Sequence, residues 1–380
     1  PDIATSLTLH WDGNTWRHIT APHVGSGGNK LMGVAGVSAD DVWAVGYTGD
    51  APDGWVPGRE YAHTLIMHWD GTAWSVVPAP TSDRGSSRLF ALSALAPDDV
   101  WAVGYSGGDD DGTYPFNSDS SATSTAGSET TPTGGGTPTL SSAEMARTRT
   151  LILNWDGKRW SEVVSPSPGA QSNALYSVAT LAKDAIWAVG VTSRDSSQHT
   201  GLGYVNTQPF VLFWDGTSWT NTPVPNMGNW AAGVAAADNS DVWVVGADSS
   251  EGSSDMRMMR WDGSSWAVVA VPTPSDVSRP GPPQNNLTGV LALTRNDVWA
   301  IGASPSVTGT RSVTKALHWD GAQWSYVPTP NLNEQDPNSG NQLYALGAAP
   351  SGELWAVGTS FMDALGSRAL IMRYDAAKCR

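Results

Sequence analysis

Two short sequence motifs, which we call phrases, alternate along the chain. The first is mostly apolar, and the second contains a polar turn. The first reads Asp-Val-Trp-Ala-Val-Gly at residues 99–104, and the second reads Trp-Asp-Gly-x-x-Trp at residues 155–160. The first phrase recurs around Trp43, Trp101, Trp187, Trp243, Trp299 and Trp355; the second begins at Trp11, Trp69, Trp155, Trp214, Trp261 and Trp319, with a worn copy at Tyr374-Asp375. The phrases hold 18 of the 20 tryptophans. Residues that recur in every repeat unit are expected to pack the fold, so this structural role is considered before any function.

Each repeat unit contains four short apolar segments, which predict four β-strands. In the second unit they span residues 89–95, 100–104, 150–155 and 160–164. In the first unit, Leu65, Met67 and Trp69 fall on one face of the third segment, and apolar residues also occupy the other face. Both faces of each sheet must therefore be covered. A radial ring of four-stranded blades satisfies that need.

Counting segments favours six blades. The chain offers 25 strands, close to the 24 of a six-bladed ring. We therefore predict an all-β protein, a six-bladed β-propeller of four-stranded antiparallel blades, with residues 1–380 as a single domain closed by strands from both chain ends. The last blade would take residues 342–360 and 369–374 from the C-terminal part and its outer strand from residues 16–20. The surplus strand, Ser6 to Trp11, would form a fifth strand or pair with a neighbouring molecule, giving a homo-oligomer.

The connections between segments differ in a way that locates a site. Asp-Gly turns join segments three and four, because Gly accepts positive φ and Asp binds nearby amides. The connections on the opposite side of the ring are long and irregular, and loops on a rigid scaffold usually carry binding. The longest is the insert at residues 105–149, rich in Ser, Thr and Gly, which we expect to be a flexible loop within one blade, since the repeat resumes at Leu151.

Composition narrows the range of partners. The net charge of −15 disfavours nucleic acid and anionic membranes, and no apolar run is long enough for membrane insertion. The single cysteine, Cys379, cannot form an internal disulfide; whether it is a tail thiol or bridges another molecule stays open. The low Lys content and abundant Ser, Thr, Gly and Asn are typical of a secreted or cell-surface bacterial protein.

The order of the phrases resembles a known repeat. Val-Trp-Ala-Val-Gly, an apolar strand, Trp-Asp-Gly-x-x-Trp and then Val-Pro is similar to the tectonin-type propeller repeat and to Trp-rich repeats of bacterial secreted β-propellers. Most copies here lie 56 to 58 residues apart, further than in tectonin. The resemblance implies a propeller and a lectin-like, glycan-binding role, since some such propellers bind glycans. It transfers no binding residue.

Residues outside the repeat are the candidates for ligand binding. Trp55 lies in a loop with Arg59 and Tyr61, and Trp230 stands where other units carry unrelated residues. An exposed aromatic ring offers a flat apolar face to a sugar or a partner side chain, although both tryptophans could instead pack their own loops. Asn229 and Asn285 belong to a polar collar that precedes the first strand of each unit, where they could satisfy backbone groups or contact a ligand.

Chemistry beyond binding has little support. Asp109, Asp110 and Asp111 offer oxygen ligands to calcium, but they lack the spacing of an EF-hand loop, so a solvated acidic loop is the alternative. No cofactor fingerprint and no catalytic motif occurs. We therefore expect a binding module for a glycan or a surface protein. A structural protein that assembles by strand exchange is the runner-up, and a glycan-active hydrolase or lyase is the third reading.

Overall fold

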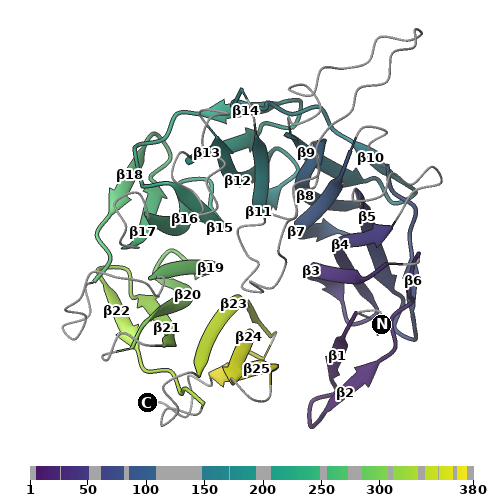
Figure 1. Cartoon of the computed structure of the whole chain (residues 1–380). Helices are drawn as coiled ribbons and strands as arrows, with labels where there is room; N and C mark the ends of the chain where they lie inside the picture. The colour runs from purple at the N-terminus through teal and green to yellow at the C-terminus, as the bar shows by residue number, and fades with distance from the viewer. Residues whose placement is uncertain are drawn as a thin grey trace, which may run out of the picture.

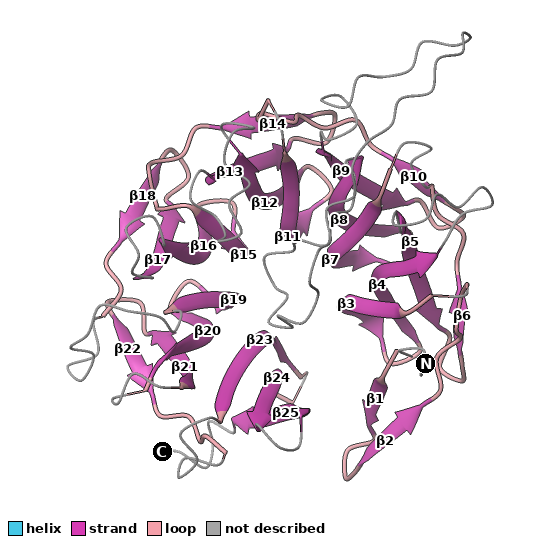
Figure 2. Cartoon of the chain, in the orientation of Figure 1, coloured by secondary structure: helices cyan, strands magenta, loops and turns pink. Residues whose placement is uncertain are grey.

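The computed structural model describes residues 6–25, 27–50, 61–80, 85–107, 148–170, 172–193, 207–248, 255–272, 285–306, 311–332, 339–349, 351–362 and 366–374. All regular structure in these ranges is β, so they contain no helix that could cross a membrane. The sheets stand round a central axis like the blades of a propeller (Figures 1 and 2). The predicted six-bladed β-propeller is confirmed.

Five blades have four antiparallel strands each. The first two are β3 (Asn29–Ser38), β4 (Asp41–Asp50), β5 (Tyr61–Trp69) and β6 (Trp74–Val76), then β7 (Ser87–Ala96), β8 (Asp99–Gly107), β9 (Thr148–Trp155) and β10 (Trp160–Glu162). The third is β11 (Asn173–Ala182), β12 (Ala185–Ser193), β13 (Thr207–Trp214) and β14 (Trp219–Thr222). The fourth is β15 (Trp230–Asp238), β16 (Asp241–Asp248), β17 (Asp255–Trp261) and β18 (Trp266–Val269), and the fifth is β19 (Asn286–Thr294), β20 (Asp297–Pro305), β21 (Ser312–Trp319) and β22 (Trp324–Val327).

The sixth blade and the start of the chain complete the strand order. The sixth blade has three described strands, β23 (Gly340–Ala348), β24 (Leu354–Met362) and β25 (Gly366–Tyr374). A separate two-stranded sheet is formed by β1 (Thr8–Trp11) and β2 (Trp16–Ile19). We call this sheet the ribbon. It lies between the first and the sixth blade (Figure 1).

The Asp-Gly turns form for the reason that the sequence indicates. In the turn of the first blade, Asp70 accepts hydrogen bonds from the backbone N–H groups of Thr72 and Ala73 at 2.8 and 2.9 Å. Gly71 takes a φ of 90°, which favours glycine. These bonds stabilise the charged carboxylate and lower the pKa of Asp70 to about 2, with the hydroxyl of Thr72 as the largest cause.

The glycine of the first phrase is required by a close backbone approach. A Cβ at Gly246 would lie 2.0 Å from the carbonyl oxygen of Trp230 on the neighbouring strand. The register of the pair shifts at this point, between Ala231 and Gly233, because the inner strand contains a bulge there. Any side chain at residue 246 would push the two strands apart.

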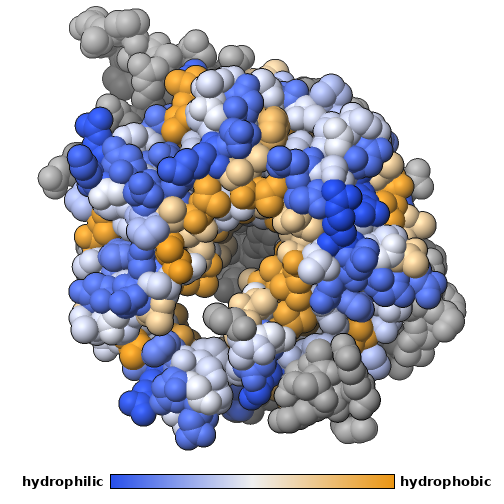
Figure 3. All heavy atoms as spheres, turned by 180° about the vertical axis from the view of Figure 1, so that it is seen from behind, coloured by the Kyte–Doolittle hydropathy of each residue, from blue (hydrophilic) through white to orange (hydrophobic). Residues whose placement is uncertain are grey.

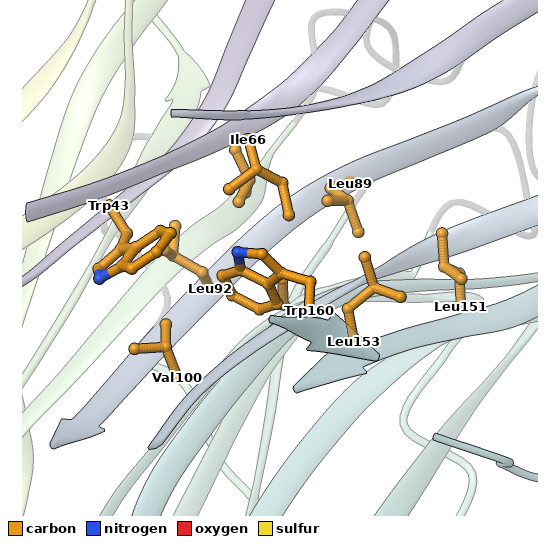
Figure 4. Packing of buried hydrophobic residues seen from close by; sticks show 10 residues of the cluster. Trp43, Ile66, Leu89, Leu92, Val100, Leu151, Leu153 and Trp160 are labelled. Atoms are coloured by element: carbon orange, nitrogen blue, oxygen red, sulfur yellow. The ribbon is translucent and has the colours of Figure 1, made fainter. Parts of the chain in front are cut away.

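The core lies between blades rather than at one centre. Figure 4 shows one such interface, where Trp43 and Ile66 of the first blade meet Leu92, Val100 and Trp160 of the second. Trp43 is 2% exposed and Trp160 is 4% exposed. Burial of large aromatic rings at each interface supplies much of the apolar area that stabilises the ring.

The tryptophans of the two phrases form a repeated contact. Except at Trp299, which contacts Tyr374, the tryptophan of the first phrase packs edge-on against the second tryptophan of the next unit and tilted against the first. Trp243 thus lies 5.1 Å from Trp324 at an interplanar angle of 86°, and 5.3 Å from Trp319 at 54°. The repeated phrases are therefore the packing surface between blades.

Strands from the two chain ends contact each other through the rings of Trp355, Trp11 and Trp16, but they do not form the predicted strand pairing. We expected residues 16–20 to supply the outer strand of the sixth blade. Instead β2 pairs with β1, Thr8 opposite Ile19 and Trp11 opposite Trp16, and neither strand pairs with β25. The reason is local, because the Asp-Gly turn between Trp11 and Trp16 joins β1 and β2 directly. The Ser6 to Trp11 segment is thus half of a hairpin rather than a fifth strand.

Candidate functional site

The innermost strand of each blade lines the central opening. Strands β3, β7, β11, β15, β19 and β23 stand closest to the axis (Figure 1), and apolar side chains gather round the opening when the ring is seen from behind (Figure 3). On the innermost strands of the second to sixth blades the leucine or alanine before the bulge is buried between blades, for example Leu89 and Leu175 at 0% exposure. The bulge then changes the direction of the next side chain.

One arc of this inner wall is aromatic. Phe90 on β7 stacks on Tyr176 of β11, with ring centroids 5.1 Å apart and planes 21° apart. Tyr176 in turn contacts Trp230 on β15 at 4.4 Å. Three consecutive innermost strands thus carry one continuous row of rings, which we call the aromatic arc. The surrounding apolar side chains raise the pKa of the Tyr176 phenol above its usual range, so this group stays neutral.

A cationic group extends the arc toward the first blade. The guanidinium of Arg88 lies over the ring of Tyr47, 4.2 Å from its centroid, and Lys30 lies 6.0 Å from the same ring. Arg88 is 8% exposed, so its charge is held against the ring rather than in solvent. This arrangement pairs flat apolar surfaces with hydrogen-bond donors.

The opposite arc is more polar. Thr288 on β19 donates a 2.6 Å hydrogen bond to the carbonyl oxygen of Leu343, which joins the fifth and sixth blades. Tyr344 is 37% exposed and donates to the side-chain oxygen of Gln342 at 2.8 Å. Partial burial raises the pKa of Tyr344, so its hydroxyl also stays protonated. Phenol and amide groups of this kind can bind a polar ligand by hydrogen bonds.

The asparagine collar fastens the chain. Asn173 receives a hydrogen bond from the backbone N–H of Gly169 at 2.7 Å and donates to the carbonyls of Gly169 and Thr148. Asn341 bonds both backbone groups of Leu332 in the same manner. These side chains hold the connection that leads into the blade. Of the two roles that the sequence left open for the collar, Asn173 and Asn341 thus have the one of binding backbone groups. Asn229 is 4% exposed and Asn285 is half-buried at the corresponding positions.

The structure corrects one predicted binding residue. Trp230 was expected to present an exposed ring, but it is 5% exposed and packed against Tyr176. Its neighbour Ala232 is also buried, because small side chains on β15 let the large ring enter the core beside Val191. Trp230 therefore supports the aromatic arc from behind rather than offering a free face to a ligand.

Several other predicted residues have no described environment. Trp55, Arg59, Asp109, Asp110 and Asp111 lie outside the described residues, so the loop site and the calcium hypothesis stay predictions. Tyr61 begins β5, with Asp50 opposite it in the register. Among the described residues, no group of three or more His, Cys, Asp or Glu side chains is placed to hold a metal ion.

Sequence reasoning missed a set of polar contacts within the blades. Asp297 accepts hydrogen bonds from the indole of Trp299 at 2.7 Å and from His318 at 3.0 Å, while the Trp299 and His318 rings lie 4.4 Å apart. Asp41 joins Trp43 and His68 in the same way. The signal was the recurrence of histidine at equivalent positions, whose partners lie on the neighbouring strand and so could be found only from the strand register.

Comparisons with known proteins give the fold but no family. No family model matches the chain, and no curated protein matches it. Among solved structures, an ulvan lyase described as a new polysaccharide lyase family has a TM-score of 0.54 at 9% identity, covering 96% of this chain and 87% of its own. The NanB sialidase from Streptococcus pneumoniae has a TM-score of 0.50 at 10% identity, covering 92% and 69%. A protein of unknown function from Dyadobacter fermentans reaches 0.50 at 12%, covering 90% and 94%.

Proposed function

We propose that the protein is a glycan-binding, lectin-like module of the cell surface or the extracellular space, which binds its ligand on the side of the ring that carries the long loops. The observation that carries this proposal is the aromatic arc. The buried rings of Phe90 and Trp230 fix the half-buried ring of Tyr176, which can offer a flat apolar face to a sugar ring beside the hydrogen-bond donors of Arg and Asn side chains.

The position of the arc supports the proposal. Phe90, Tyr176 and Trp230 lie near the beginning of their strands, where the collar residues Asn173 and Asn229 mark the entry from the long connections. The connection that contains Trp55 and Arg59 and leads to Tyr61, the first residue of β5, belongs to the same set, since it joins the second and third strands of the first blade. We expect residues of this connection and the Tyr176 ring to contact the same ligand.

The fold is compatible with a glycan ligand. The structures similar to this chain include a polysaccharide lyase and a sialidase, both of which act on glycans. At 9 to 10% identity the similarity covers the propeller and no reaction. It therefore supports the class of ligand only through the scaffold, while the residues of this chain must supply the recognition.

Glycan microarrays with matched variants test the proposal. We expect the wild-type protein to retain a restricted set of glycans, and Trp55→Ala or Tyr176→Ala to weaken binding by about tenfold or more, because each removes a stacking ring. Tyr176→Phe keeps the ring and should change binding little. Val164→Ala, at a side chain 91% exposed on the outer strand side, is the surface control.

Thermal unfolding of the same variants separates binding from folding. A variant that keeps the wild-type melting temperature and loses glycan has lost a binding contact, whereas folded wild-type protein that retains no glycan would make the proposal wrong. It is equally wrong if both alanine variants bind as the wild type does.

A further inference from the structure

The ribbon repeats the geometry of the outer half of a blade. Trp355 of the sixth blade lies 5.5 Å from Trp11 at an angle of 51°, and 5.4 Å from Trp16 at 88°. The interface between the fourth and fifth blades has the same two contacts, at 54° and 86°. The ribbon therefore stands where the third and fourth strands of a further unit would stand, after the sixth blade and before the first.

The inner half of this position has no described strand. In every complete blade the third strand pairs on both sides, as β5 does with β4 and β6. Within the described ranges β1 pairs only with β2, so its inner edge carries no ladder of hydrogen bonds. An unpaired strand edge of this kind is a template for another strand.

The first blade shows an uncovered apolar face toward this position. Val34 on β3 is 68% exposed, whereas Leu92, Val178 and Val234 at the equivalent positions are 5 to 8% exposed. Val42 is half-buried, although Val100, Val242 and Val298 at its position are fully buried. Those other valines are covered by the inner strands of the preceding blade.

The sixth blade shows the matching face on the other side. Val357 on β24 is 40% exposed, while Val45, Val103, Val189 and Val245 at the equivalent positions are 0% exposed. Each of those residues is covered by the inner strands of the following blade, as in the packing of Val245 with Leu287 and Ala300. The position after the sixth blade is thus a slot with two apolar walls and a strand edge as its floor.

The slot also offers a binding position for a tryptophan ring. In the fifth blade, Trp299 stacks on His318 of the adjoining strand and both bind Asp297. His10 occupies the position of His318 on β1, and its ring lies 6.2 Å from Trp69 of the first blade. No described carboxylate binds His10, in contrast to His68 and His318.

We propose that this slot binds one β-hairpin of a partner polypeptide that carries the first phrase, Asp-x-Trp-x-x-Gly. The hairpin would pair with β1, place its tryptophan opposite His10 and against Trp69, and cover Val34 and Val357. The site continues the Trp355 interface already present in the ring, and the guest aspartate is complementary to His10. The hairpin would bind by strand addition: its backbone would pair with β1, and its side chains would contact the first and sixth blades on either side.

A synthetic peptide with the sequence of residues 285–304 is the probe. It contains Asp297 and Trp299, which already bind a histidine at the position of His10. Isothermal titration of the full 380-residue chain should give a 1:1 complex with a Kd on the order of 10 μM, allowing for the ordering of the peptide. The peptide with Trp299→Ala should bind at least tenfold more weakly, because it lacks the ring that would lie opposite His10 and against Trp69.

Variants of the protein locate the complex in the slot. Val34→Asp and Val357→Asp change exposed side chains, so the protein should fold and lose the peptide by tenfold or more. Val164→Asp lies away from the slot and should bind as the wild type does, while His10→Ala should weaken binding several-fold. A far-UV spectrum and melting temperature like those of the wild type confirm that each variant is folded.

Three outcomes overturn the proposal. The first is a folded wild-type protein that does not bind the peptide. The second is binding that Val34→Asp and Val357→Asp leave unchanged, since the peptide would then bind elsewhere. The third is a concentration-dependent dimer that Val34→Asp abolishes, because the occupant would then be a second copy of this chain.

Discussion

The interface between the fourth and fifth blades and the interface between the sixth blade and the ribbon contain equivalent tryptophan contacts. The tryptophans are buried to different extents at the two places. In the former, Trp324 of the fifth blade makes an edge contact with Trp243 and is 6% exposed. In the latter, Trp16 makes the same edge contact with Trp355 but is 39% exposed. The difference shows that a tryptophan contact is buried only when inner strands stand on both sides of it, so the phrase alone does not make a core.

Substitutions at two equivalent valines should differ strongly in their effect on the free energy of unfolding. Val234→Asp places a carboxylate in a site 5% exposed and should destabilise the protein by more than about 3 kcal/mol, because the charge is desolvated without a partner. Val34→Asp at the equivalent, 68% exposed position should change the free energy of unfolding by less than about 0.5 kcal/mol. Urea unfolding of both variants measures the difference. Equal destabilisation would mean that Val34 is covered in solution.

Low pH should lower the stability of the protein by a smaller amount than Val234→Asp does. The backbone N–H of Ser265 and other groups lower the pKa of Asp262 to about 2, and the backbone N–H of Thr15 and other groups do the same for Asp12 in the ribbon. A carboxylate with a lowered folded pKa contributes stability that is present above its unfolded pKa near 3.8 and is lost as pH falls toward 2. The melting temperature should therefore fall between about pH 4 and pH 2.

Replacement of the two aspartates separates the regions. Asp262→Asn should reduce the loss of melting temperature in this pH range, because one titrating group of the cooperative ring is removed. Asp12→Asn should leave the global transition almost unchanged, since the ribbon can open locally without unfolding the blades. Calorimetry at pH 2, 3, 4 and 5 checks both. The same reduction for both variants would show that the ribbon unfolds together with the ring.

The sequence predicts the repeated parts of the fold well for a physical reason. Tryptophan spacing, apolar alternation and Asp-Gly turns are local signals, and each is repeated, so errors at one copy are corrected by the others. The six blades, the turn role of Asp70 and the backbone role of Asn173 follow from such signals. The pairing of β2 does not, because the outer strand of the sixth blade and the partner of β1 have the same apolar pattern.

The candidate site was harder to predict because its geometry depends on neighbouring strands. Trp230 reads as a residue outside the repeat, yet small residues such as Ala232 allow its ring to enter the core against Tyr176. The pairing of Asp297 with His318 likewise requires the register of β20 and β21. The exposure of Val34 could not be inferred at all, since the sequence of β3 is as apolar as that of the covered strands.

Hydrogen exchange of the β1 amides tests whether the inner edge of β1 is unpaired, as it is among the described residues. We expect the amides of Thr8 to Trp11 to exchange much faster than those of β17, the equivalent strand of the fourth blade. Addition of the residue 285–304 peptide should slow exchange in β1 and leave β17 unchanged. Protection of β1 equal to that of β17 in the purified protein, with no peptide present, would show that the inner edge of β1 is already paired.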